Sequence, residues 1–214
     1  MRILYIDLGL HKQAKEIDMM MQICSQIPEP IELTVIGIEA DPEYIPYLKV
    51  KYEAYPRVGI LNFAIAGKHG TVKLYRSAST DGEGNSIYPT KNNVSREDFV
   101  EVQAMPLSYI LRALDPIGYD LKILKTNIEG AELEMIQDLI ATDSHGLIDI
   151  FCGATSDIHK VAELSDQQEQ YHQMLKDAGI DWQLFHDTYK PRDKEIMMAN
   201  MRLGIMELLS ISPP

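Results

Sequence analysis

The chain has 214 residues, with 20 lysines and arginines against 32 aspartates and glutamates, which gives a formal net charge of −12 at pH 7. The phosphate backbone of nucleic acids and anionic membrane surfaces both attract positive charge, so neither is the expected partner. Hydrophobic residues make up 45% and charged residues 24%. This composition is typical of a globular domain and favours neither a disordered nor a fibrous class.

The two cysteines, Cys24 and Cys152, lie in apolar runs. Two cysteines are too few for a disulfide framework, so we interpret both as free, buried thiols in a reducing compartment. Met1 and Arg2 lead directly into an apolar strand, and no apolar run reaches the length of a membrane span. We therefore expect a cytoplasmic protein without a signal peptide or a membrane anchor.

The first 66 residues alternate short apolar runs with helical patterns. Residues 3–7 form a β-branched apolar run that ends in an acid and a glycine, which is typical of a buried parallel strand. The elements predicted here are a strand over 3–7, a helix over 12–25, a strand over 33–38, a helix over 42–54 with Asp41 as its N-cap, and a strand over 58–66.

Residues 67–105 interrupt this alternation. Residues 71–75 and 99–102 alternate apolar and polar side chains, as antiparallel strands do, and a polar stretch rich in Gly, Ser and Asn separates them. We interpret the region as a small β-hairpin insertion that carries a mobile loop.

The alternation then resumes. The elements predicted here are a helix over 106–114, a strand over 121–127, a helix over 129–140, a strand over 147–152, a helix over 158–178 and a strand over 180–185 after Gly179. Residues 196–211 fit a helix, a strand or one after the other. Strands separated by crossover helices predict a single α/β domain over 1–214, with a doubly wound, mostly parallel sheet and helices on both faces.

In such sheets the ligand lies beyond the carboxyl ends of the strands. At the end of the first strand, Gly9 permits a tight turn, and the following helix directs free N–H groups to the same space. The turn lacks the G-x-G-x-x-G pattern that a pyrophosphate cofactor needs. Asp7 beside the turn suits a cationic ligand such as a sulfonium, although it could also serve only to order the turn.

Glu39 ends the second predicted strand. An acid at this position of nucleotide-binding α/β folds accepts hydrogen bonds from a ribose diol. Nicotinamide dinucleotides and S-adenosylmethionine both carry that diol, so the position favours either cofactor. A solvated acid without a ligand explains the position equally well.

Residues 125–132 read Lys-Thr-Asn-Ile-Glu-Gly-Ala-Glu and join the fourth predicted strand of the sheet to its helix. Glu129 and Glu132 could face a substrate, or they could stabilise the helix N-terminus through its dipole. For Glu129 the adjacent Gly130 favours the first interpretation, because a glycine permits close approach by a bulky group.

The run over 124–132 resembles the signature of the FkbM-type methyltransferases, which contains a lysine, an acid and a Glu-Gly-Ala-Glu segment. The resemblance covers most of the chain; its other parts lie at 5–9, 37–42, 62–66, 70–74, 84–88 and 105–110. It implies the class I, Rossmann-like methyltransferase fold, with an antiparallel seventh strand that would fall in the tail. It also implies S-adenosyl-L-methionine as cofactor and methyl transfer to oxygen on a sugar or polyketide-type product.

The matching positions imply a cofactor site formed by Asp7, Gly9, Leu10, Glu39, Ala40, Ala64 and Asn127. The chain departs from the family pattern at two places. Asn127 stands where the family usually has Asp, which removes a possible general base or metal ligand. The first turn lacks a second glycine. Either departure could weaken catalysis or change the substrate.

Three residues are candidates for catalysis. Glu129 is the first candidate for the base, and Asn127 lies two residues before it. His11 is a substitute base, because an imidazole titrates near neutral pH, although a surface histidine at a helix start is the simpler explanation. No residue cluster has the spacing of a closed zinc site, so no metal ligand is assigned. Whether the acids at the strand ends hold Mg²⁺ stays open.

We therefore expect an O-methyltransferase acting on a small-molecule or carbohydrate acceptor. Two alternatives stay open: a catalytically degenerate methyltransferase fold that acts as a binding module, and a NAD(P)-dependent reductase, which the missing glycines disfavour. The sequence also leaves a homo-oligomer open.

Overall fold

A computed structural model describes residues 1–78, 83–154, 157–183, 202 and 204–207 of the chain. Its main sheet has six strands in the order β3-β2-β1-β7-β8-β9, and every neighbouring pair is parallel. The strands are β1 (Arg2–Leu8), β2 (Glu32–Glu39), β3 (Val58–Asn62), β7 (Leu121–Thr126), β8 (Ile150–Gly153) and β9 (Trp182–Gln183). The predicted parallel sheet is confirmed, and its strand order reverses beside β1, where such folds bind ligands.

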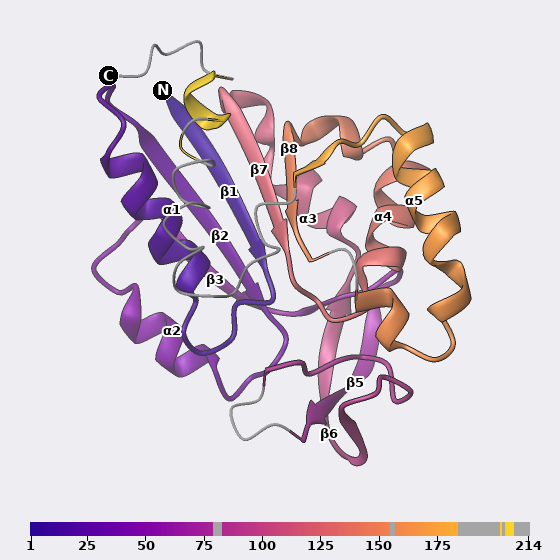
Figure 1. Cartoon of the computed structure of the whole chain (residues 1–214). Coiled ribbons are helices and arrows are strands. Elements are labelled where there is room, and N and C mark those ends of the chain that lie inside the picture. Colours follow the sequence, from indigo (N-terminus) through magenta and orange to yellow (C-terminus); the bar gives the residue numbers. More distant parts are fainter. Residues whose placement is uncertain (79–82, 155–156, 184–201, 203, 208–214) are drawn as a thin grey trace.

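The predicted hairpin insertion is also confirmed. β5 (Gly70–Ser77) pairs antiparallel with β6 (Val94–Met105), and the short β4 (Ala64–Ile65) pairs parallel with the end of β6. Figure 1 shows that β5 and β6 lie beyond the carboxyl ends of the main strands. Part of the loop predicted to be mobile, residues 79–82, lies outside the described residues.

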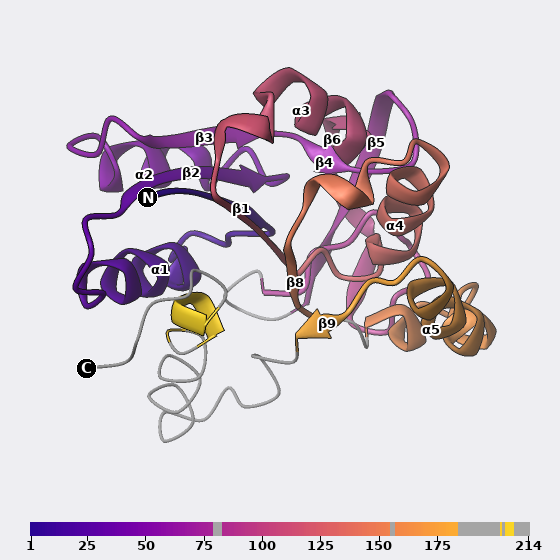
Figure 2. The same ribbon diagram turned by 90° about the horizontal axis from the view of Figure 1, so that it is seen from above.

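Helices cover both faces of the main sheet, as Figure 2 shows. α1 (Lys15–Ser25) and α2 (Ile45–Lys51) contribute to one buried cluster. α3 (Leu107–Leu114), α4 (Glu132–Ala141) and α5 (Gln168–Asp177) contribute to the other. Four single-turn 3₁₀ helices complete the described elements: η1 (Pro116–Gly118), η2 (His145–Leu147), η3 (Asp157–Lys160) and η4 (Ser165–Gln167).

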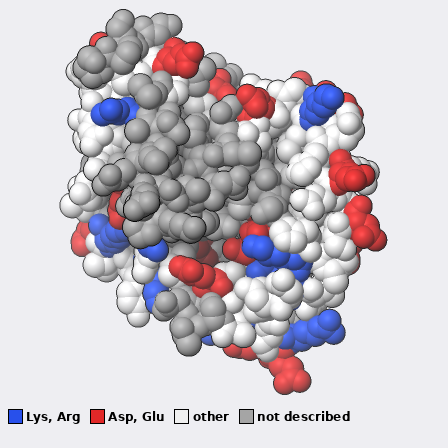
Figure 3. Space-filling view, in the orientation of Figure 1, with Lys and Arg blue, Asp and Glu red and all other residues white. Residues whose placement is uncertain are grey.

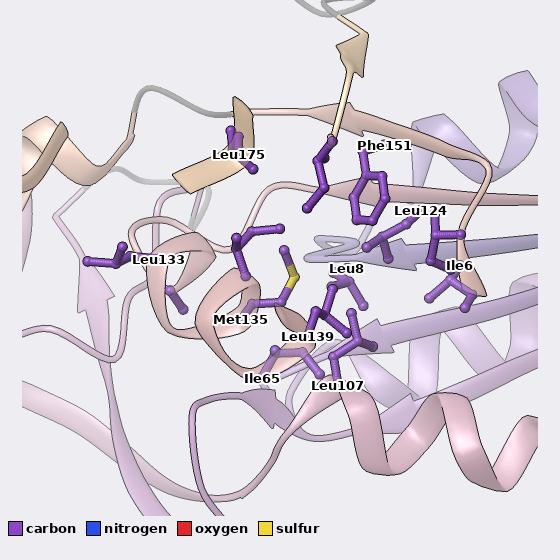
Figure 4. Close-up of a cluster of buried hydrophobic side chains, with 14 of the residues drawn as sticks. Ile6, Leu8, Ile65, Leu107, Leu124, Leu133, Met135, Leu139, Phe151 and Leu175 are labelled. Carbon is purple, nitrogen blue, oxygen red and sulfur yellow. The ribbon is translucent and has the colours of Figure 1, made fainter. Parts of the chain in front are cut away.

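The apolar run of β1 is buried on both sides. Ile6 and Leu8 pack in the cluster beneath α3 and α4, which Figure 4 shows around Met135, whereas Ile3 and Tyr5 pack against α1. Successive side chains of a strand point to opposite faces, so a strand covered on both faces must be apolar at nearly every position. Full burial of each such side chain contributes about 1.5–3 kcal/mol.

Three helices begin three residues later than predicted. α1 begins at Lys15 rather than at residue 12, since Ala14 has φ of 43°, outside the helical region. α2 begins at Ile45 rather than at Pro42, because Asp41 closes a turn: its carboxylate accepts the Glu43 N–H at 3.0 Å. α4 begins at Glu132 rather than at residue 129, since Glu129 and Gly130 have φ of 58° and 110°, outside the helical region.

The strand predicted over 58–66 is divided between the two sheets. The side-chain amide of Asn62 donates to the carbonyls of Glu39 and Ala40 at 2.8 and 3.0 Å, at the end of the β3–β2 pairing, and residues 64–65 then pair with β6. The helix predicted over 158–178 is also interrupted, because Val161 forms a β-bridge with Lys91 of the insertion. Both corrections arise from contacts distant in sequence.

The last predicted elements are only partly described. Of the strand predicted over 180–185, β9 covers Trp182 and Gln183, and residues 184–185 lie outside the described residues. Within the tail, residue 202 and residues 204–207 are helical; the other positions at which the antiparallel strand was expected are also outside the described residues. In the described part of the chain, no helix combines the length and apolarity needed to cross a bilayer.

Candidate functional site

A cavity of about 500 Å³ lies where the carboxyl ends of β1, β2 and β7 meet the insertion. This volume is within the range of about 300–1,000 Å³ that small-molecule sites occupy. Figure 3 shows acidic and basic side chains close together on this side of the molecule. Most of the residues predicted for the site line the cavity: Gly9, Leu10, His11, Glu39, Ala40, Ala64, Asn127 and Glu129.

The turn after β1 depends on Gly9. Gly9 has φ of 78°, and its N–H donates to the Ile38 carbonyl at 2.9 Å. A Cβ at this position would lie 1.9 Å from the carbonyl oxygen of Asn127. The glycine therefore brings the ends of β1, β2 and β7 together at one edge of the cavity.

Replacing Gly9 by alanine is expected to lower the free energy of unfolding by about 2 kcal/mol or more, because the added Cβ combines a steric clash with an unfavourable φ. Urea unfolding followed by circular dichroism measures the change. Gly146→Ala is a matched control, since a Cβ at residue 146 meets no atom within 4 Å. Equal stability of the two variants would contradict the role given to Gly9.

Asp7 lies behind this turn, and it is not among the residues that line the cavity. Its carboxylate is fully buried and forms an ion pair with Lys125 at 2.9 Å. The Lys125 ammonium also donates to the Gly9 carbonyl at 3.3 Å. Burial raises the pKa of Asp7 to about 6, although Lys125 opposes the rise. The structure thus places Asp7 in support of the turn rather than on the cavity wall.

Glu39 lies at the end of β2, as predicted, and its carboxylate is anchored by the backbone. One oxygen accepts the His11 N–H and the other accepts the Asp41 N–H, both at 2.8 Å. Burial raises the pKa of Glu39 to about 7, although these two donors lower it. A carboxylate has about four acceptor positions, so each oxygen retains capacity for a further hydrogen bond.

Leu10 and His11 occupy the stretch where the turn departs from the family pattern. Leu10 is buried, and a Cβ at Gly37 would lie 2.7 Å from its Cδ1, so its side chain also belongs to the core. The His11 ring packs edge-on against Tyr44 with the ring centroids 5.2 Å apart. Through its N–H, His11 is held beside Glu39.

The turn between β7 and α4 is held by Glu132. The Glu132 carboxylate accepts the N–H groups of Ile128 and Gly130 at 2.8 and 2.7 Å. Gly130 is needed here because a Cβ would lie 2.6 Å from the Val161 side chain. Of the two alternatives for Glu132, the structure favours the structural one, and the turn that it holds carries Glu129 into the cavity wall.

The buried carboxyl group of Glu132 predicts a pH-dependent stability. Burial raises its pKa to about 7 from 4.5, so the folded protein binds the proton more tightly than the unfolded chain does. The resulting stabilisation is complete below about pH 4.5 and is lost as the pH rises to about 7. Relative to that of Glu132→Gln, the free energy of unfolding of the wild type is expected to fall by about 1–3 kcal/mol between pH 5 and pH 8. Urea unfolding of both proteins at both pH values tests this. The same stability difference between wild type and Glu132→Gln at pH 5 and at pH 8 would contradict it.

Glu129 is fixed by the insertion at two points. Its carboxylate lies 2.9 Å from the Lys91 ammonium, and its carbonyl accepts the Ser86 hydroxyl at 2.7 Å. Burial raises the pKa of Glu129, Asp157 adds to the rise, and Lys91 opposes it. Asn127, two residues earlier, lines the cavity, and its N–H donates to the Leu8 carbonyl at 2.9 Å.

Among the polar residues that sequence reasoning missed at the site, four surround Glu129. Lys91 and Ser86 contact Glu129, while Asp157 lies on the cavity wall and forms an ion pair with Lys160. Asp157 follows the end of β8, so the strand-end rule could have found it. Lys91 lies in a polar loop with no recognisable pattern, and only the folded chain brings it to Glu129.

The site does not show a preformed metal centre: among the described residues, no group of three His, Cys, Asp or Glu side chains is arranged to hold an ion. The described groups at the cavity are instead carboxylates, lysines, an amide and backbone N–H donors. These groups can bind a polar ligand and accept a proton.

Comparison with known families identifies the fold. The Methyltransferase FkbM domain matches residues 31–179, which is more than half of the chain. No curated protein gave a significant match. The matched region begins at the entry to β2, after the first turn, and it includes Glu39, the insertion and the turn that carries Glu129. The chain therefore belongs to the FkbM methyltransferase family, and its α/β fold is that of a Rossmann-like methyltransferase.

Proposed function

We propose that the protein transfers a methyl group from S-adenosyl-L-methionine to a hydroxyl oxygen of a small-molecule or carbohydrate acceptor. The observation that carries this proposal is that one cavity joins the Glu39 carboxylate at the end of β2 to the Glu129 carboxylate beside the insertion. The Glu39 carboxylate can accept hydrogen bonds from the cofactor's ribose, and the Glu129 carboxylate can accept the proton of an acceptor's hydroxyl.

The residues of the cavity fit this cofactor. Glu39 keeps one acceptor position on each oxygen, which matches the two hydroxyls of a ribose. The described lining is also acidic, with five carboxylates against two lysines: Glu16, Glu39, Glu83, Glu129 and Asp157, and Lys15 and Lys160. An acidic wall favours a ligand with net positive charge, and S-adenosylmethionine carries a sulfonium and an ammonium against one carboxylate.

When bound, this cofactor supplies an electrophilic methyl group: the acceptor oxygen's lone pair forms the new C–O bond, and the sulfur keeps the electrons of the broken C–S bond. The chain's own residues would orient the acceptor and receive its proton. The Asn127 amide can orient a hydroxyl but cannot accept its proton at neutral pH. The Glu129 carboxylate can do so, which makes it the preferred base over Asn127 and over His11, which is held beside Glu39.

Calorimetry with S-adenosylmethionine and S-adenosylhomocysteine tests the cofactor directly, and we expect both to bind. A panel of hydroxylated acceptors with labelled methyl donor then tests the transfer. Incorporation of label into an alkali-stable ether is the expected product. Failure of both cofactor forms to bind at millimolar concentration would overturn the proposal.

A binding module with a degenerate active site is the second candidate, because Asn127 follows β7 at the position where the family resemblance implies an acid. This candidate predicts cofactor binding, or binding of a partner, with no label transferred to any acceptor. A NAD(P)H fluorescence titration separates the reductase alternative, for which we expect no response because the turn lacks the glycine pattern.

We also propose a cytoplasmic location for the protein. The free thiols of Cys24 and Cys152 support a reducing compartment. Detection of the protein in cell fractions would test this.

A further inference from the structure

Lys91 is a buried lysine that the insertion directs at the active-site turn. Its side chain is 1% exposed, and its ammonium lies 2.9 Å from the Glu129 carboxylate and 3.0 Å from the Gly84 carbonyl. The side-chain oxygen of Asn93 is its third acceptor. A lysine ammonium has three N–H donors, so each of them has an acceptor. Two acceptors belong to its own loop, and the third is the proposed base.

The backbone around Lys91 is held independently of its side chain. Lys91 forms a β-bridge with Val161, and the Asn92 N–H donates to the Lys160 carbonyl at 3.0 Å. A buried ammonium is costly to desolvate unless an anion and good hydrogen bonds compensate it. These backbone contacts hold the loop without the need for a buried charge. The position of the Lys91 ammonium therefore indicates that it acts on Glu129.

We propose that Lys91 is a positioning residue whose ammonium holds the Glu129 carboxylate ionised and directed at the cavity. This inference rests on the proposed function, in which Glu129 accepts the acceptor's proton. The same loop fixes the Glu129 backbone through Ser86, at a residue whose φ of 58° is unfavourable for glutamate. The insertion thus sets both the position and the charge of the base.

The charged groups around Glu129 show why Lys91 matters. Asp157 and Lys160 face it from η3, Glu132 faces it from α4, and Lys91 faces it from the insertion. Lys160 forms an ion pair with Asp157, whereas the ammonium of Lys91 bonds directly to Glu129. Burial and Asp157 already raise the pKa of Glu129 against the opposing effect of Lys91, so removal of Lys91 would raise that pKa further and Glu129 would retain its proton to higher pH.

The test uses Lys91→Met in the full chain. Loss of a cation at this distance is expected to move the acidic limb of the kcat/KM profile about one to three pH units higher. The Kd of S-adenosylmethionine is expected to stay unchanged, because Lys91 does not line the cavity. Lys91→Arg keeps the positive charge but replaces the ammonium by a larger, planar guanidinium. Its acidic limb should therefore lie at the wild-type pH, while its kcat stays below that of the wild type.

Asn93→Ala is the matched control. It removes a loop acceptor of Lys91 without changing any charge, so it loosens the same loop. We expect its acidic limb to coincide with that of the wild type. If Lys91→Met and Asn93→Ala lose activity to the same extent and the acidic limbs of both stay at the wild-type pH, Lys91 has only a structural role and the proposal is overturned.

A second readout needs no acceptor. Carbon-13 carboxyl titration by NMR, assigned with Glu129→Gln, should show a higher pKa for Glu129 in Lys91→Met than in the wild type. An unchanged titration overturns this proposal even if methyl transfer is real, whereas absent cofactor binding in the wild type overturns the proposed function alone. If Lys91→Met does not fold, a pH titration of the wild type replaces it. The Lys91 Nζ resonance should then change with the same midpoint pH as the Glu129 carboxyl resonance, and absence of that change overturns the proposal.

Discussion

Replacing Glu129 by glutamine is expected to lower kcat for methyl transfer about 10²–10⁴-fold, the range that general bases contribute. The carboxamide keeps the size of the side chain but cannot accept the acceptor's proton. Because Glu39 and the first turn are untouched, the Kd of S-adenosylmethionine should change little. A labelled-methyl assay and calorimetry measure the two effects separately.

Glu163→Gln is a suitable control for this variant. Glu163 is an exposed acid that bonds to Thr90 and does not line the cavity. It should retain wild-type kcat and cofactor affinity. Full activity of Glu129→Gln with a proven acceptor would show that another group takes the proton. Thermal melting of both variants is needed, because Lys91 loses its anionic partner when Glu129 is replaced.

Replacing Glu39 by glutamine is expected to weaken binding of S-adenosylmethionine about 10²–10³-fold. Hydrogen bonds to a charged group contribute about 1.5–3 kcal/mol each, and the neutral amide would weaken or remove those to the ribose. The amide also presents an NH₂ group to one of the two backbone N–H donors, His11 or Asp41, that the carboxylate satisfies. Isothermal calorimetry measures the loss of affinity.

The same residue predicts how cofactor binding depends on pH. In the ligand-free protein the pKa of Glu39 is raised to about 7 by burial, so the carboxylate is largely protonated at pH 6 and ionised at pH 8. The ionised form accepts both ribose hydroxyls. Affinity should therefore rise with pH up to about 7 and then level off, and Glu39→Gln should lose this dependence. A pH-independent wild-type affinity would contradict the role of Glu39.

The sequence by itself determined the main sheet and one end of the cavity. Short β-branched apolar runs such as residues 3–7 favour strands buried on both faces, and parallel strands bring their carboxyl ends to one edge. Gly9 and Glu39 could be found this way because each directly follows or ends a strand. The antiparallel hairpin was also predictable, because its alternation repeats every two residues.

Only the tertiary structure decided the other end of the cavity. The start of the helix after β7 could not be placed correctly, because Glu129 has φ of 58° in a turn that Glu132 and the distant Ser86 hold by hydrogen bonds. Lys91 and Glu129 are 38 positions apart, and no periodic pattern connects them. Likewise, only the structure showed that Asp7 forms an ion pair with Lys125 and does not line the cavity. Side-chain pairing across distant segments depends on the packed fold, and for that reason the sequence pattern alone did not reveal it.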